Sequence, residues 1–134
     1  MKHDDLKLLH GLVEAKYQVR QQAFQSLLSR EAALRNDLQK LEAQGRASES
    51  ETASDMRAIG GDVIWKAWLG KARTSLNMQL ALVLAEKEQH VRQVQQAYGK
   101  VLATEELMAK SDKEQRRQRQ TAQLAQAIAL SVIR

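Results

Sequence analysis

A ladder of regularly spaced apolar residues runs along almost the whole chain and is interrupted once. Its positions advance in steps of three and four, and a few of them are polar. In the first half they are Leu6, Leu9, Val13, Tyr17, Arg20, Phe24, Leu27, Glu31, Leu34, Leu38 and Leu41; in the second half they are Trp65, Leu69, Ala72, Leu76, Leu80, Leu84, Lys87, Val91, Val94, Tyr98, Val101, Glu105 and Met108. Apolar residues that repeat about every 3.5 positions keep facing a partner helix along a supercoil. Because the chain contains no proline, the ladder predicts two long, unbroken helices.

The interruption predicts where the chain turns. Residues 46–61 lose the period and are rich in Ser, Glu and Gly, which loosen or compete with helix. Gly45 stands where a glycine commonly closes a helix, and Asp62 is a good N-cap for the next one. We predict a single all-α domain over residues 1–134, an antiparallel two-helix coiled-coil hairpin with a longer C-terminal helix. Its parts are a helix over about 4–44, a turn over 45–61 that includes a short extra helix around 55–59 as an alternative, and a helix over about 62–130.

Folding the chain at this turn leaves the second helix longer than the first. The fold places Trp65 near Leu41, Leu6 near residue 100, and Arg20 near Lys87. More than twenty residues of the second helix then extend beyond the first. An unpaired apolar helix end is typical of a binding surface, so we expect residues 111–134 to bind a partner or a second copy of the chain. The side chains expected to do so are Arg116, Arg117, Arg119, Leu124, Ile128 and Leu130.

Composition excludes several classes of protein. The 134 residues contain no cysteine, which excludes disulfide frameworks and thiolate metal sites. The three histidines are isolated, and the sequence has neither a glycine-rich phosphate loop nor a nucleophile elbow. A two-helix hairpin also has no interior for a small-molecule pocket. We therefore predict a non-enzymatic protein without cofactor or metal. The apolar runs are short and no signal peptide is recognisable, so we expect a cytoplasmic location.

The net charge of +5 belongs entirely to the second half of the chain. Residues 1–60 carry nine basic and nine acidic side chains, whereas residues 61–134 carry twelve basic and seven acidic ones. The excess concentrates between Lys110 and Arg119. Such a segment favours an acidic protein surface, nucleic acid or anionic lipid. Nucleic acid is disfavoured, because the segment lacks the aromatic side chains on which bases stack.

Two further groups of residues have open interpretations. Trp65, Trp68 and Leu69 begin the second helix, where they form a protein-binding patch or plug the end of the hairpin. The polar ladder residues, Arg20, Glu31, Lys87 and Glu105, either contact a partner or, as we favour, extend from the seam and set its register.

The second half resembles the FliJ family of flagellar export proteins and their YscO-like relatives in virulence secretion. The resemblance rests on the Trp-x-x-Trp start in the stretch Ile64–Ala72, the glutamine-rich body that follows, and the late Arg/Gln-rich segment up to Gln118. The first helix matches only in its leucine and glutamine heptads. The apolar finish over residues 127–133 departs from the polar tail of that family.

The resemblance implies a part in flagellar or type III protein export. Proteins of that family resemble the central stalk of rotary ATPases, and they couple the hexameric export ATPase to the export gate at the periphery of the inner membrane. The resemblance leaves open which end contacts the ATPase and which secretion system is served. The alternatives are a generic coiled-coil adaptor or secretion chaperone, and a basic helix that binds a membrane surface or nucleic acid.

Overall fold

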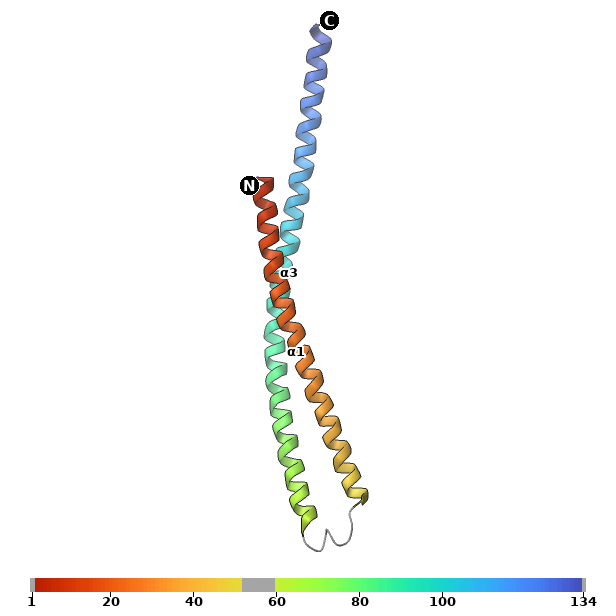
Figure 1. Ribbon diagram of the computed structural model, residues 1–134. Helices are drawn as coiled ribbons and strands as arrows, with labels where there is room; N and C mark the ends of the chain where they lie inside the picture. The colour runs from red at the N-terminus through yellow and green to blue at the C-terminus, as the bar shows by residue number, and fades with distance from the viewer. Residues whose placement is uncertain (1, 52–59, 134) are drawn as a thin grey trace. The chain divides into compact units, whose positions relative to one another are not determined.

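Two long helices make up the part of the chain that the structure describes. The computed structural model describes residues 2–51 and 60–133, and in these ranges it contains α1, His3–Glu51, and α3, Gly61–Ile133. Figure 1 draws α1 from red to yellow and α3 from green to blue. The described residues contain no strand, which confirms the all-α prediction. The alternative short helix around residues 55–59 lies outside the described residues.

The helix starts follow the local sequence closely. Asp4 and Asp5 lie in the first turn of α1, where negative charge faces the positive end of the helix dipole. Gly60 precedes α3 with a φ of 76°, a left-handed conformation that glycine adopts without strain. Its carbonyl accepts a 3.3 Å hydrogen bond from the Ile64 amide. Asp62, which the sequence predicted as the N-cap, instead lies inside the first turn of α3.

The predicted end of the first helix at Gln44 is wrong, because α1 continues through Gly45 to Glu51. Gly45 costs about 1 kcal/mol relative to alanine in a helix interior. Contacts with α3 offset this cost. A Cβ built on Gly45 would lie 3.6 Å from Leu69 Cδ1, and Ser48, one turn further on, accepts a 2.7 Å hydrogen bond from Trp65 Nε1. Tertiary packing therefore outweighs the local preference for a stop.

Substituting the two glycines tests this helix boundary. We expect Gly45→Ala to stabilise the protein by about 0.5–1 kcal/mol, since the new methyl group makes an ordinary contact with Leu69 and alanine favours helix. Gly60→Ala should destabilise by about 1–2 kcal/mol, because its φ is positive. Thermal unfolding followed by circular dichroism measures both. Destabilisation by Gly45→Ala would instead indicate that the helix ends there.

The chain divides into two compact units, each built from a segment of both helices. Unit 1 comprises Met1–Arg20 and Gln93–Arg134, and unit 2 comprises Gln21–Arg92. In unit 2, Arg30 lies 3.6 Å from Glu86, Glu31 lies 2.7 Å from Lys87, and Ser48 bonds Trp65. In unit 1, His3 lies 3.3 Å from Asp112, His10 lies 3.5 Å from Glu105, and Arg20 Nη1 donates a 2.9 Å hydrogen bond to Gln93.

These contacts correct the predicted register. Trp65 lies beside Ser48 rather than Leu41, and the expected neighbours Arg20 and Lys87 have separate partners, Gln93 and Glu31. The error has one physical cause. Because α1 continues past Gly45, each residue of α1 meets a residue of α3 that lies further along the chain than a turn at 45 implies.

The buried side chains refine the ladder of the second helix. The buried apolar residues are Leu6, Leu27, Leu41, Leu69, Val83 and Val101. Val83 is 1% exposed whereas Leu84, the predicted ladder residue, is 36% exposed. Similarly, Thr104 is buried and Glu105 is exposed. Leu76 and Leu80 are half-buried, and the next packed position is Val83, three residues after Leu80, where the ladder predicted Leu84, four residues after it.

Candidate partner-binding surfaces

The two tryptophans at the start of α3 stack on each other but have different surroundings. Their ring centroids lie 5.1 Å apart with planes inclined by 16°. Trp65 is half-buried, and its Nε1 donates to Ser48 Oγ, which in turn donates to the Gly45 carbonyl at 2.9 Å. Trp68 is 51% exposed. Trp65 therefore fastens α3 to the last turns of α1, while Trp68 presents an aromatic surface suited to a protein partner.

Leu69, the third residue predicted for this patch, is not available to a partner. It is buried against α1, with Cδ1 3.6 Å from where a Gly45 Cβ would lie. Its burial agrees with its place on the ladder, from which Trp68 is absent.

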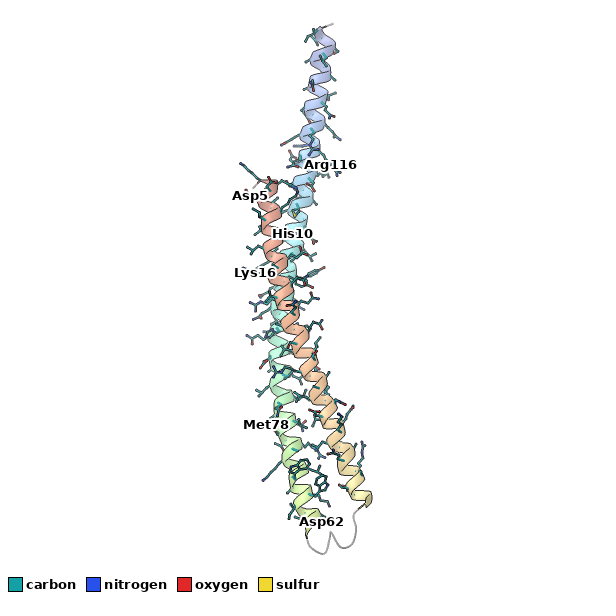
Figure 2. The ribbon with its side chains drawn as sticks, viewed as in Figure 1. Asp5, His10, Lys16, Asp62, Met78 and Arg116 are labelled. Carbon is teal, nitrogen blue, oxygen red and sulfur yellow. The ribbon has the colours of Figure 1, made fainter. Side chains whose placement is uncertain are left out.

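The predicted basic segment lies on an exposed part of α3. Arg116, Arg117 and Arg119 are all exposed, and Arg117 donates a 2.9 Å hydrogen bond to Glu114 on its own helix. Figure 2 labels Arg116 on α3. An exposed ion pair of this kind contributes little to stability. The segment therefore presents positive charge that is accessible to an acidic partner surface.

The apolar end of α3 is exposed as well. Leu124, Ile128 and Leu130 are between 55% and 62% exposed, and every side chain from Arg116 to Ile133 is exposed. Residues 121–133 carry no charged side chain. The unpaired part begins later than the predicted residue 111, because His3 contacts both Ser111 and Asp112. At 1.5 Å per residue, residues 116–133 extend over roughly 27 Å.

Two of the polar ladder residues pair with each other across unit 2. Lys87 Nζ donates a 2.7 Å hydrogen bond to Glu31 Oε1, and Arg35 lies 3.5 Å from the same carboxylate. The bonded Lys87 ammonium holds the pKa of the Glu31 carboxyl below its ordinary value, against the opposing effect of desolvation. This pair joins α1 and α3 across the seam of unit 2.

The lowered pKa of Glu31 predicts an acid-dependent loss of stability. A carboxyl whose pKa is lower in the folded state stabilises the fold above its unfolded-state pKa. This contribution is lost as the pH falls through the lower, folded-state pKa. We expect the free energy of unfolding of the wild type to fall more steeply between about pH 5 and pH 2 than that of Glu31→Gln. Urea unfolding at each pH measures this, with Glu42→Gln, at an exposed position of α1, as the matched control. Parallel curves for wild type and Glu31→Gln would contradict it.

The histidines are less isolated than the sequence suggested. His3 Nδ1 lies 3.3 Å from Ser111 Oγ, and His10 lies 3.7 Å from Glu14 and 3.5 Å from Glu105. The contacts with Ser111 and Glu105 join distant parts of the chain, so spacing along the sequence could not reveal them, whereas Glu14 follows His10 by four residues on the same helix. Among the described residues, no three metal-ligating side chains form a group that could hold an ion.

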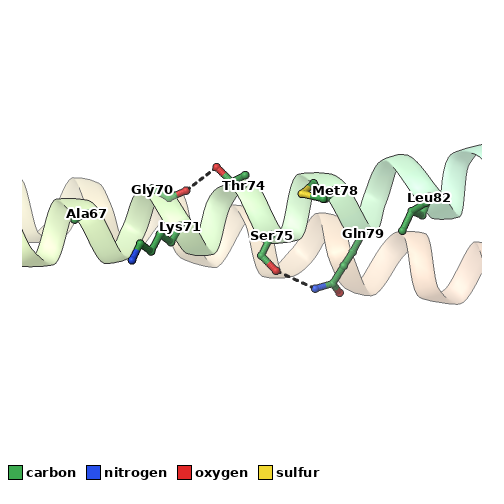
Figure 3. Close-up of a pocket in the computed structure, with 8 residues that line it drawn as sticks. All are labelled: Ala67, Gly70, Lys71, Thr74, Ser75, Met78, Gln79 and Leu82. Carbon is green, nitrogen blue, oxygen red and sulfur yellow. Dashed lines mark hydrogen bonds between the residues drawn. The ribbon is translucent and has the colours of Figure 1, made fainter.

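An additional surface, which the ladder does not include, follows the outer side of α3 in unit 2. Figure 3 shows its residues, which all come from α3 and are mostly small or apolar: Ala67, Gly70, Lys71, Thr74, Ser75, Met78, Gln79 and Leu82. Met78 and Leu82 are 63% and 65% exposed. Two hydrogen bonds within the helix, Thr74 to the Gly70 carbonyl and Gln79 to Ser75, satisfy polar groups of this face. The signal was a second set of apolar residues at helical spacing beside the seam.

Comparisons with known proteins identify no family for this chain. No protein-family model, no curated protein and no solved structure matches the chain. Neither helix, within the described residues, has a stretch long and apolar enough to cross a membrane.

Proposed function

We propose that this chain is a non-enzymatic coiled-coil component of a flagellar or type III protein export apparatus. In this proposal α1 and α3 form an antiparallel coiled-coil hairpin, and the free end of α3 binds the export ATPase. The chain would thereby couple the ATPase to the export gate, in the manner of a rotary ATPase stalk. The resemblance of the Trp-x-x-Trp start and the Arg/Gln-rich segment to the FliJ family suggests this particular apparatus.

The exposed end of α3 is the observation that carries the proposal. The first turn of α1 reaches Ser111 and Asp112, and beyond Arg116 all described side chains are exposed. A helix of roughly 27 Å that places a basic segment before an uncharged apolar one suits insertion into a ring with an acidic rim. The pairing of Glu31 with Lys87 supports the coiled-coil part, since polar pairs on a seam select one register.

A pull-down with the export ATPase tests this function. The tagged full chain should retain a purified flagellar or type III export ATPase, and retention should weaken as the salt concentration rises, because the basic segment contributes. The chain should also raise the rate of ATP hydrolysis by the ATPase. If the ATPase is neither retained nor stimulated, the proposal fails.

A generic coiled-coil adaptor or secretion chaperone is the second candidate. It is favoured by the exposed Trp68 and by the outer face of α3 that includes Met78 and Leu82, since these surfaces suit a partner helix. Retention of an export substrate or another helical protein, without the ATPase, would support this candidate.

A further inference from the structure

Unit 1 carries a second apolar stripe on α1 that the contacts with α3 leave exposed. Leu8, Leu12 and Val19 are 75%, 55% and 65% exposed, and Ala15 between them is exposed too. Their spacing of four, three and four residues is the heptad spacing that faces a partner helix. The seam of α1 is a different set, which includes the buried Leu6. The stripe does not pack against α3, and its spacing suits contact with a further helix.

The stripe borders a groove between α1 and α3. The groove has a volume of about 620 Å³ and is open on one side. Ten residues from both helices line it: Leu12, Val13, Ala15, Lys16, Val19, Arg20, Gln93, Gln96, Ala97 and Lys100. A groove between two helices that has apolar side chains of α1 in its lining suits an amphipathic helix.

The charges of the groove have a single sign. Lys16, Arg20 and Lys100 line it, and none of its ten lining residues is acidic. The acidic side chains Glu14 and Glu105 instead contact His10 and do not line the groove. Figure 2 labels Lys16 and His10 on α1. Basic residues beside an apolar stripe select a helix that carries acidic residues beside its own apolar stripe.

We propose that this groove, lined by Lys16, Arg20 and Lys100 beside Leu12 and Val19, is a docking site for an acidic amphipathic helix of another protein. A second copy of the chain fits less well. The chain carries a net charge of +5, and its own exposed apolar end, residues 121–133, contains no acidic residue. The proposal goes beyond the proposed function, because neither the end of α3 nor the tryptophan pair takes part in it.

A designed peptide pair tests the docking site. One fluorescein-labelled helical peptide carries leucines at heptad spacing flanked by glutamates, and the other carries lysines in place of the glutamates. Fluorescence anisotropy with the full chain should detect binding of the glutamate peptide only. The double substitution Lys16→Glu/Lys100→Glu should weaken this binding at least tenfold, and Val19→Glu should weaken it similarly. The matched control Lys40→Glu/Arg73→Glu makes the same charge change at exposed positions of unit 2, one on each helix, and should leave it unchanged.

Several results would overturn the proposal. These are failure of the glutamate peptide to bind, equal binding of both peptides, and equal losses in the groove and control variants.

Sedimentation with phosphatidylserine vesicles that depends on Lys16 and Lys100, without peptide binding, would assign the groove to lipid instead. Sedimentation velocity that shows a dimer abolished by Val19→Glu would assign it to a second copy. Circular dichroism checks that each variant folds, which is expected because the substituted side chains are exposed. Export ATPase binding is measured separately, so failure here leaves the proposed function standing.

Discussion

Val83→Asp is expected to destabilise unit 2 by about 3 kcal/mol or more, since it places an unpaired charge at the most buried apolar position of the seam. For a chain of this length that corresponds to a fall in the melting temperature of roughly 10 °C. Leu84→Asp is the matched control. It makes the same kind of change one residue further on, where the side chain is 36% exposed, and we expect a loss of about 1 kcal/mol or less.

Thermal and urea unfolding, followed by circular dichroism, measure both variants. The pair distinguishes the observed seam from the ladder predicted by the sequence, in which Leu84 is the core residue. A larger loss for Leu84→Asp than for Val83→Asp would show that the register of α3 is wrong.

Truncation before Arg116 is expected to abolish binding to the export ATPase and leave the fold intact. Residues 116–133 have exposed side chains, so removing them uncovers little buried apolar surface. The truncated chain should therefore keep its helical circular dichroism and unfold cooperatively at nearly the same temperature. The chain is cut after residue 115 rather than after 110, because the longer deletion would also remove the contacts of His3 with Ser111 and Asp112.

The matched control for the truncation is Trp68→Ala, which alters the other predicted surface and should leave ATPase binding intact. If the truncated chain unfolds, residues 116–133 contribute to the fold. If it binds the ATPase as well as the full chain does, the tail is not the ATPase-binding end.

The sequence predicted the all-helical fold and the exposure of the α3 end, because both depend on local pattern. Heptad spacing without proline is sufficient to identify two long helices. The difference in helix length then requires that part of α3 lacks a partner on α1. Leu124, Ile128 and Leu130 were accordingly predicted as exposed, and they are.

The register and the helix end were not predictable in the same way. Gly45 carries a local stop signal, and only its neighbours on α3, Leu69 and Trp65, show why the helix continues. Val83 and Leu84 are adjacent and both apolar, so the pattern alone does not decide which one faces α1. The pairing of Glu31 with Lys87 depends on the register of the two helices, so it could not be predicted before that register was known.

Site-specific cross-linking tests whether the free end of α3 contacts the export ATPase, as proposed. Because the chain contains no cysteine, a single cysteine at position 124 or at position 68 can carry a benzophenone cross-linker without background labelling. With the purified ATPase present, we expect a cross-linked product from Leu124→Cys and none from Trp68→Cys. A product from Trp68→Cys alone, or from neither variant, would contradict it.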